Sequence, residues 1–116
     1  MPVTTIDTTD VLALANIQVR PGTFDQHICW EVLEQNVYRV PNRFGPADVI
    51  LDIGAHIGCF SLLAYARGSR KIFAFEALPQ NYRMLVRHAM GLLDAVHPVF
   101  GAVWRETDVE FMCYVP

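Results

Sequence analysis

The stretch VILDIGAHIGCF, residues 49–60, constrains the fold more than any other part of the sequence. It passes from an almost unbroken aliphatic run through one carboxylate and two glycines into a second apolar segment. Continuous aliphatic runs of this kind are typical of strands that are covered on both faces in a parallel sheet. The glycines predict a tight turn, and the residues after them place apolar side chains at helical spacing. The stretch therefore predicts a buried strand, a turn and a helix.

The next segment repeats this alternation of strand and helix. Gly68 stands where the C-terminal cap of the first helix is expected. The residues KIFAFEA then predict a second buried strand. Pro79 suits the first turn of a second helix because an N–H group is unpaired there in any case, and Gly91 ends that helix. The two units have the same order, so one supersecondary pattern is repeated.

Two further strands are predicted after the second helix. HPVFGAVW predicts a third strand, and VEFMCYV predicts a fourth that is joined to it by a hairpin at RETD. Short links between alternating strands and helices imply right-handed crossovers and a parallel sheet. We therefore expect an α/β fold, a Rossmann-like parallel sheet with flanking helices that is truncated after about three parallel strands and a C-terminal hairpin strand.

The chain before this pattern is interpreted as a separate leading segment. Residues 1–47 are interrupted by turn dipeptides, and we expect them to pack on the core formed by residues 48–116. Within the leading segment, HICWEVLEQNVYRV predicts a helix followed by a short strand over residues 37–40. Residues 48–116 then represent the N-terminal half of a Rossmann-like domain.

Charge and hydropathy exclude several classes of partner. The net charge of −3 argues against a nucleic-acid partner, because such proteins normally carry an excess of basic residues. The N-terminus has no basic region followed by an apolar run, so it does not resemble a signal peptide. The longest uncharged apolar stretch, IGCFSLLAYA, is too short to cross a bilayer. These observations predict a cytoplasmic protein with neither a membrane nor a nucleic acid as partner.

The cysteines point to a reducing compartment. Cys29, Cys59 and Cys113 are odd in number and widely spaced, and they form no CxxC pair or Cys/His cluster. This pattern indicates neither a disulfide framework nor a metal site. We expect buried, reduced thiols.

Two glycines and two acids are the candidate binding residues. Ligands of such sheets lie beyond the carboxyl ends of the strands, where Gly54 and Gly58 let the backbone approach a ligand closely. Glu76 ends the second strand and can accept hydrogen bonds from the vicinal hydroxyls of a ribose. Asp52 lies inside the first strand and needs a partner, either backbone N–H groups, water or a cationic ligand. Alternatively, the glycines serve only the turn, Glu76 is an ordinary strand-end acid, and Asp52 caps the turn.

The glycine spacing decides between two nucleoside cofactors. A dinucleotide fingerprint is GxGxxG, whereas this loop reads GAHIG, with His56 in place of the middle glycine. A histidine side chain would obstruct a pyrophosphate, and the upstream Asp52 fits a cationic ligand better than an anionic one. Dinucleotide binding of the NAD(P) type therefore stays as the alternative.

At these residues the chain resembles the FkbM-like family of class I S-adenosylmethionine-dependent methyltransferases. The resemblance covers roughly residues 27–104 and rests on DVILDIGAHIGCFSLLA, KIFAFEALPQNYRMLVRHA and WEVLEQNVYRVP. The first stretch matches a DxGxxxG motif, and the second supplies the strand-end acid. The chain departs from the family where His56 replaces the more usual Asn and Ala77 replaces the usual Pro.

The resemblance implies S-adenosyl-L-methionine as cofactor and a hydroxyl-bearing small molecule, a sugar or secondary metabolite, as methyl acceptor. The loop between the glycines would line the methionine part, and the strand-end acid would hold the ribose. The implied cofactor-binding residues are Asp52, Gly54, Ala55, His56, Gly58, Glu76 and Ala77. Such enzymes work by in-line displacement, mainly through alignment of donor and acceptor. No catalytic residue is assigned, and a non-catalytic interaction domain of the same fold remains a further alternative.

The resemblance also implies that part of the domain is missing. Members of this family have seven strands, and the strand that pairs with the other edge of the first strand would follow Pro116. We therefore expect a fragment that carries half of the cofactor site and is inactive alone. The unpaired edge of the strand at residues 49–53 is expected to promote self-association.

Overall fold

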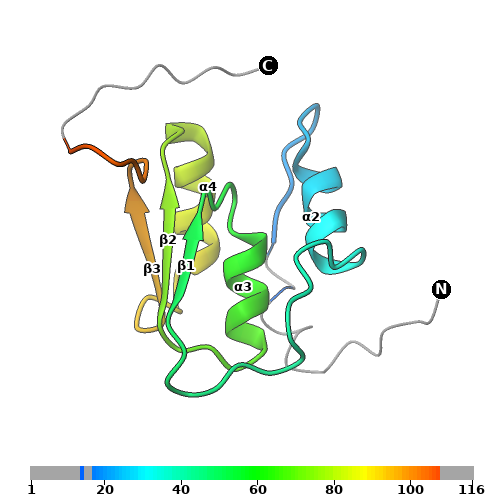
Figure 1. Ribbon diagram of the computed structural model, residues 1–116. Coiled ribbons are helices and arrows are strands. Elements are labelled where there is room, and N and C mark those ends of the chain that lie inside the picture. Colours follow the sequence, from blue (N-terminus) through cyan, green and yellow to red (C-terminus); the bar gives the residue numbers. More distant parts are fainter. Residues whose placement is uncertain (1–13, 15–16, 108–116) are drawn as a thin grey trace.

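The computed structural model describes residue 14 and residues 17–107. One parallel sheet with the order β1-β2-β3 lies at its centre (Figure 1). Its strands are β1 (Ile50–Ile53), β2 (Ile72–Glu76) and β3 (Val96–Phe100). The predicted α/β fold with a parallel sheet is therefore confirmed. The predicted fourth strand and most of its hairpin lie outside the described residues.

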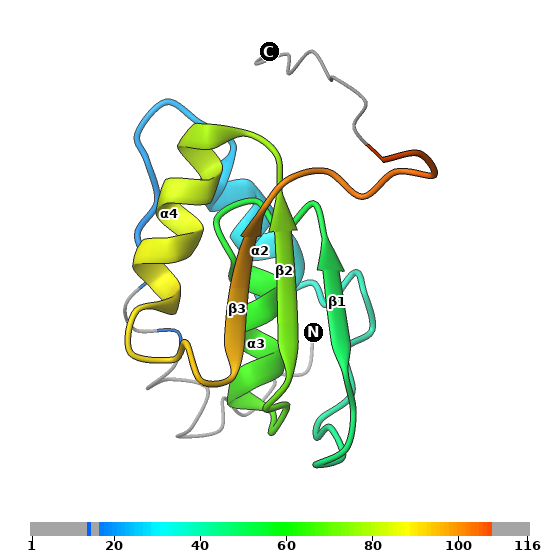
Figure 2. The same cartoon turned by 90° about the vertical axis from the view of Figure 1, so that its left-hand side faces the viewer.

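Three helices cover one face of this sheet. They are α2 (Asp25–Leu33), α3 (Cys59–Ala66) and α4 (Pro79–Ala89). Figure 1 and Figure 2 together show all three on the same side, with α2 outside α3. The two crossovers run in the same direction across the sheet, and right-handed crossovers of that kind place their helices on the same face.

The helix ends form as the local sequence predicts. Pro79 is the first residue of α4. Gly68 follows α3 with φ +103°, and its N–H donates to the carbonyl of Tyr65 at 3.0 Å. Gly91 follows α4 with φ +85°. These left-handed conformations suit glycine, which has no Cβ to clash.

The core lies between the sheet and its helices in adjoining clusters. One cluster joins the sheet to both crossover helices through Ala64, Ile72, Ala89 and Val96, all of them fully buried. A second cluster joins α2 to α3 and to the loop before α3, and its largest member is the fully buried Ile57. The leading segment thus contacts the core through α2, while the domain boundary at residue 47 stays a prediction.

The expectation that the first strand is covered on both faces is wrong. Val49, Leu51 and Ile53 are 53%, 59% and 59% exposed, because no described element lies over the face opposite the helices. Asp52 points to the covered side and is buried. The alternating burial follows from the pleat, which turns successive side chains to opposite faces.

Two further secondary-structure predictions need correction. The helix predicted in the leading segment is confirmed as α2, but no strand follows it: residues 37–38 form a turn and residues 39–40 are irregular. Asn36 and Arg39 have φ of +49° and +52°, which lie outside the extended region, and the Asn36 side chain accepts the N–H of Val40 at 2.8 Å. The third strand is also shorter than predicted, since it ends at Phe100.

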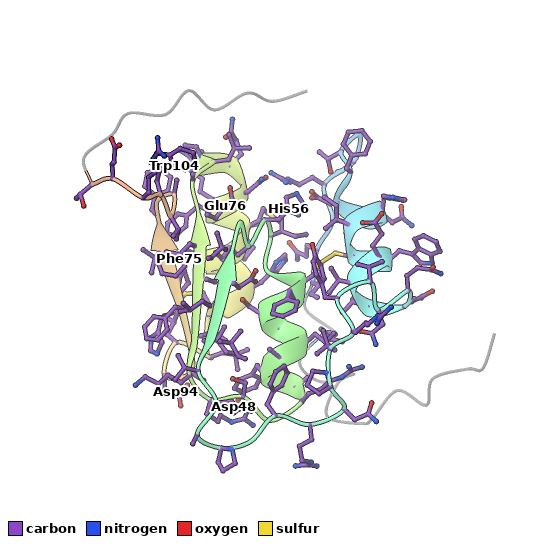
Figure 3. All side chains as sticks on the ribbon, in the orientation of Figure 1. Asp48, His56, Phe75, Glu76, Asp94 and Trp104 are labelled. Carbon is purple, nitrogen blue, oxygen red and sulfur yellow. A yellow bond between two sulfur atoms is a disulfide. The ribbon has the colours of Figure 1, made fainter. Side chains whose placement is uncertain are left out.

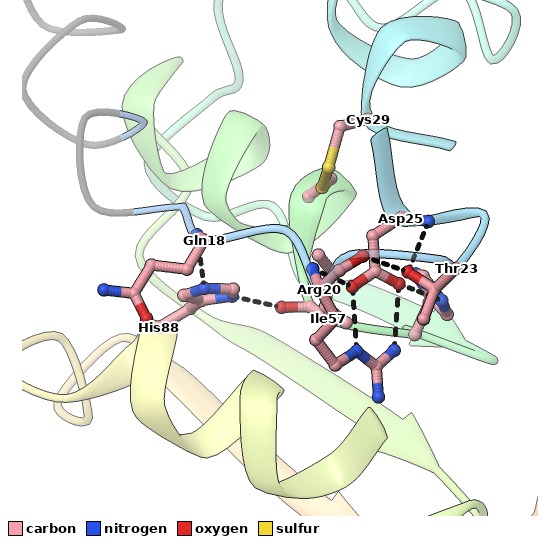
Figure 4. The surroundings of a disulfide bond; sticks show 9 residues. Gln18, Arg20, Thr23, Asp25, Cys29, Ile57 and His88 are labelled. Carbon is pink, nitrogen blue, oxygen red and sulfur yellow. Dashed lines mark hydrogen bonds and ion pairs between the residues drawn. A yellow bond between two sulfur atoms is a disulfide. The ribbon is translucent and has the colours of Figure 1, made fainter. Parts of the chain in front are cut away.

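The expectation of reduced thiols is wrong for two of the three cysteines. Cys29 on α2 and Cys59 at the start of α3 form a disulfide (Figure 4). Their Cα atoms are 5.8 Å apart, within the usual range for such a bond. The packing of α2 on α3 brings them together, and sequence spacing cannot reveal that contact. Cys113 lies outside the described residues.

Within the described part of the chain, no helix combines the length and the apolar character needed to cross a bilayer.

Candidate functional site

A pocket of about 310 Å³ opens beside the carboxyl end of β1. It lies between β1, the loop that follows β1, the start of α3 and the inner side of α2. Apolar and aromatic side chains form most of its wall, and Asp52 and His56 supply the polar groups. The lining residues are Ile28, Val32, Tyr38, Leu51, Asp52, Ile53, Gly54, Ala55, His56, Cys59 and Phe60.

The predicted site residues divide between this pocket and its supporting structure. Asp52, Gly54, Ala55 and His56 line the pocket, whereas Gly58, Glu76 and Ala77 do not. Glu76 and His56 nevertheless lie close together at the carboxyl end of the sheet, and Asp48 and Asp94 lie at the opposite end (Figure 3). The structure therefore brings the glycine loop and the strand-end acid to one place.

Asp52 finds its partner at the start of α3. The hydroxyl of Ser61 donates to Asp52 Oδ2 at 2.7 Å, and the Asp52 residue is only 9% exposed. Burial raises the pKa of Asp52, although hydrogen bonds from the side chain and backbone of Ser61 oppose that rise. The partner of Asp52 is therefore the hydroxyl of Ser61 on α3, which was not among the partners considered from the sequence. The sequence signal for Ser61 was a hydroxyl in the first turn of the predicted helix.

Glu76 holds the loop with both carboxylate oxygens. Its Oε1 accepts the backbone N–H of His56 at 2.8 Å, and its Oε2 accepts the backbone N–H of Leu78 at 2.8 Å. Glu76 is only 8% exposed. Each oxygen retains a further lone pair, so the carboxylate can still accept hydrogen bonds from a ligand.

The two glycines of the loop serve different purposes. Gly54 has φ +73°, and a Cβ built there would meet no atom within 4 Å. Gly58 has φ +102°, and a Cβ there would lie 2.9 Å from Leu85 Cδ1 on α4. Gly54 therefore leaves open space beside the backbone, whereas Gly58 allows the loop to pack closely on α4.

An ion pair between Arg20 and the fully buried Asp25, behind the loop, was missed by sequence reasoning. Arg20 donates from Nε and Nη2 to the two carboxylate oxygens of Asp25 at 2.8 Å and 2.9 Å (Figure 4). Its Nη2 also donates to Asn81 Oδ1 at 2.7 Å. The hydrogen bonds from Arg20 lower the pKa of Asp25 to about 2. Asp25 Oδ1 lies 3.3 Å from His56 Nε2. No local motif predicts this cluster, because α2 and the loop are distant in sequence.

His56 occupies an unusual place in this cluster. Its backbone has φ +57°, a region that histidine adopts more readily than most residues. Burial lowers the pKa of His56, and the nearby Asp25 only partly offsets that effect. Its Nδ1 atom is buried and has no hydrogen-bond partner among the described residues.

The described residues contain no group of three or more His, Cys, Asp or Glu side chains that could hold a metal ion. The candidate site consists of a glycine loop that Glu76 holds, the carboxyl group of Asp52 beside it, and His56 next to the Arg20–Asp25 ion pair. In comparisons with known proteins, the chain matches no family model and no curated protein.

Proposed function

We propose that this chain binds S-adenosyl-L-methionine and serves methyl transfer to a hydroxyl-bearing small molecule. The supporting observation is the hydrogen bond from the His56 backbone to Glu76. It joins the loop of the first strand to the acid of the second, which belong to two of the three stretches on which the family resemblance rests. A nucleoside ligand would need both at the same end of the sheet.

Residues of the pocket and of the neighbouring end of β2 fit such a cofactor in three respects. The open space beside Gly54 allows a ligand to approach the backbone. The carboxyl group of Asp52, when ionised, favours a cationic ligand over an anionic one. Glu76 retains lone pairs that can accept hydrogen bonds from ribose hydroxyls. Asp52 also disfavours the pyrophosphate of a dinucleotide.

The cofactor would supply a methyl group on a cationic sulfur. The chain would contribute binding and orientation, since fixing donor and acceptor in line removes much of the entropic barrier. Glu76 would hold the ribose while it fixes the backbone of His56, so that one carboxylate positions both the ligand and the loop. The apolar wall of the pocket would exclude water from the methionine end.

Calorimetric titration tests this proposal. S-adenosylmethionine, S-adenosylhomocysteine and NAD are titrated into the purified chain, into Glu76→Gln and into Asp94→Asn. Asp94→Asn is the matched control, because it removes one carboxylate at the opposite end of the sheet (Figure 3). We expect the first two ligands to bind, and Glu76→Gln to weaken them about 10- to 100-fold, as for a lost hydrogen bond to a charged group.

The outcomes separate the alternatives. Binding of NAD instead of the methionine-derived ligands would support a dinucleotide-binding module. Absence of binding by all three ligands would support a non-catalytic interaction domain. Thermal unfolding of Glu76→Gln is measured in parallel, because the new amide nitrogen would face a backbone N–H and could loosen the loop.

A further inference from the structure

The backbone of His56 is held in an unusual conformation. The residue has φ +57° and its N–H is held by Glu76 at 2.8 Å. Non-glycine residues in this region carry a conformational cost of about 1 kcal/mol or more, and they are frequent at ligand sites. The imidazole lines the pocket, and its side chain is 22% exposed.

The two ring nitrogens of His56 face different surroundings. Nε2 lies 3.3 Å from Oδ1 of Asp25, a fully buried carboxylate that Arg20 keeps ionised. A carboxylate only accepts hydrogen bonds, so Nε2 carries the proton. In a neutral imidazole the other nitrogen then carries the lone pair. Nδ1 is therefore an acceptor, and it has no donor among the described residues.

A buried acceptor without a donor is unfavourable and needs an explanation. A ligand that brings an N–H group would complete the hydrogen bonding of the ring. The charged groups that face His56 are Asp25, Glu76 and Arg20. Two acids and one base leave a net negative surrounding, which favours a cationic donor. The ammonium group of an amino acid is such a donor, with three N–H bonds and no acceptor.

We propose that neutral His56, oriented by Asp25, accepts a hydrogen bond through Nδ1 from the α-ammonium group of the cofactor's methionine part. His56 is then a binding residue and Asp25 a positioning residue. This inference rests on the proposed function. It gives a role to the histidine that stands where the family that the chain resembles more usually has Asn.

The arrangement makes cofactor binding sensitive to acid. Protonated His56 has no lone pair, and its positive charge repels the ammonium group. Burial already lowers the pKa of His56 below its ordinary value of 6.5, so the ring is neutral at pH 7. Affinity should therefore be constant near neutral pH and fall once the pH drops below the lowered pKa. Each further pH unit should then weaken binding about tenfold.

The experiment is a calorimetric titration of S-adenosylhomocysteine at pH values from 8 to 5. The unmodified chain is compared with His56→Asn, because Asn tolerates the left-handed backbone and does not titrate. The matched control is His97→Asn, since the His97 ring packs on Phe73, in the sheet. We expect the loss of affinity in acid to disappear in His56→Asn and to persist in His97→Asn. The ¹⁵N shifts of the free chain should show a neutral His56 with its proton on Nε2.

The contrary results are distinct. A profile that is flat in the unmodified chain, or an acid loss that persists in His56→Asn, would overturn the role of His56 and leave the proposed function intact. Absence of S-adenosylhomocysteine binding at every pH would overturn both. A protonated His56 at pH 7 in the ¹⁵N spectrum would also overturn the assignment of Nδ1 as the acceptor.

Discussion

The two faces of the sheet differ in whether other elements cover them. The covered face carries buried side chains such as Ile72, Ala74 and Val96, and two of the helices on that side, α2 and α3, are linked by a disulfide. The open face carries the exposed Leu51 and Ile53, and no described element covers it (Figure 2). Both faces are largely apolar in sequence, so composition does not distinguish them.

The two faces also differ in where the buried polar groups lie. Three acids are buried on the helix side of the sheet or at its carboxyl end, and each has hydrogen-bond partners in the chain. They are Asp25, Asp52 and Glu76. Buried polar groups require such partners, and their positions define the candidate site. The open face offers hydrophobic contact area and little specificity. The comparison therefore predicts large effects of substitution on one face and small effects on the other.

The largest effect on stability should come from the disulfide. Cys29 and Cys59 are separated by 30 residues, and closing a loop of that length stabilises a chain by about 3.5 kcal/mol in the chain-entropy model. Cys29→Ser should lower the free energy of unfolding in urea by about this amount. The control is the unmodified chain in dithiothreitol, which lacks the same link and should lose a similar amount of stability. Equal stability of Cys29→Ser and the oxidised unmodified chain would mean that the covered face does not depend on this link.

The next largest effect should come from the core of the covered face. Ile72 is fully buried in the middle strand, so Ile72→Ala removes packed methyl groups and should cost about 3 kcal/mol. Leu51→Ala is the matched change on the open face, where the side chain is 59% exposed, and it should cost less than about 0.5 kcal/mol. Urea unfolding of both variants measures the contrast. Similar costs would show that the open face is covered in solution.

The ion pair behind the loop should contribute less, and its contribution should depend on pH. The pKa of Asp25 is lowered to about 2, so its stabilisation is present above the ordinary value of 3.8 and is lost as the pH falls from there to about 2. Asp25→Asn should cost about 1–2 kcal/mol at pH 7, allowing for the solvent that reaches Arg20. The cost should vanish near pH 2. Asp94→Asn, which removes an exposed carboxylate, should change the free energy of unfolding at pH 7 by less than about 0.5 kcal/mol.

The sequence predicted those features that depend on local chemistry. Pro79 at the start of α4 and Gly68 after α3 follow from backbone geometry alone, and both predictions are confirmed. The Cys29–Cys59 link and the Asp25–His56 contact could not be predicted, because both depend on how α2 docks. The candidate site was thus foreseen along β1 and β2, and its support from the leading segment was not.

The burial of β1 was mispredicted for a different physical reason. An aliphatic run shows that a strand is apolar on both faces, but it does not show whether both faces are covered. The direction of the two crossovers decides that, and here both place their helices on one side. The exposure of Leu51 and Ile53 is therefore a property of topology and not of the residues themselves.

The last prediction concerns the unpaired edge of β1, which borders the open face of the sheet. It should have the smallest effect on stability. In the described residues β1 pairs only with β2, so the other edge of β1 presents unpaired backbone groups beside exposed aliphatic side chains. Such edges pair readily with other strands. We predict concentration-dependent self-association in sedimentation velocity. Ile53→Lys should abolish it while changing the free energy of unfolding by less than about 0.5 kcal/mol.

The control for this last prediction is Leu93→Lys, which places the same charge at an exposed leucine outside the strands. It should leave the association unchanged, because the predicted contact depends on the edge of β1 and not on every exposed apolar side chain. A chain that remains monomeric at all concentrations would contradict the prediction, as would an equal loss of association in both lysine variants. Specific loss in Ile53→Lys would locate the contact at β1, beside the pocket that Ile53 also lines. Self-association would then compete with ligand binding, and S-adenosylhomocysteine should shift the chain toward monomer.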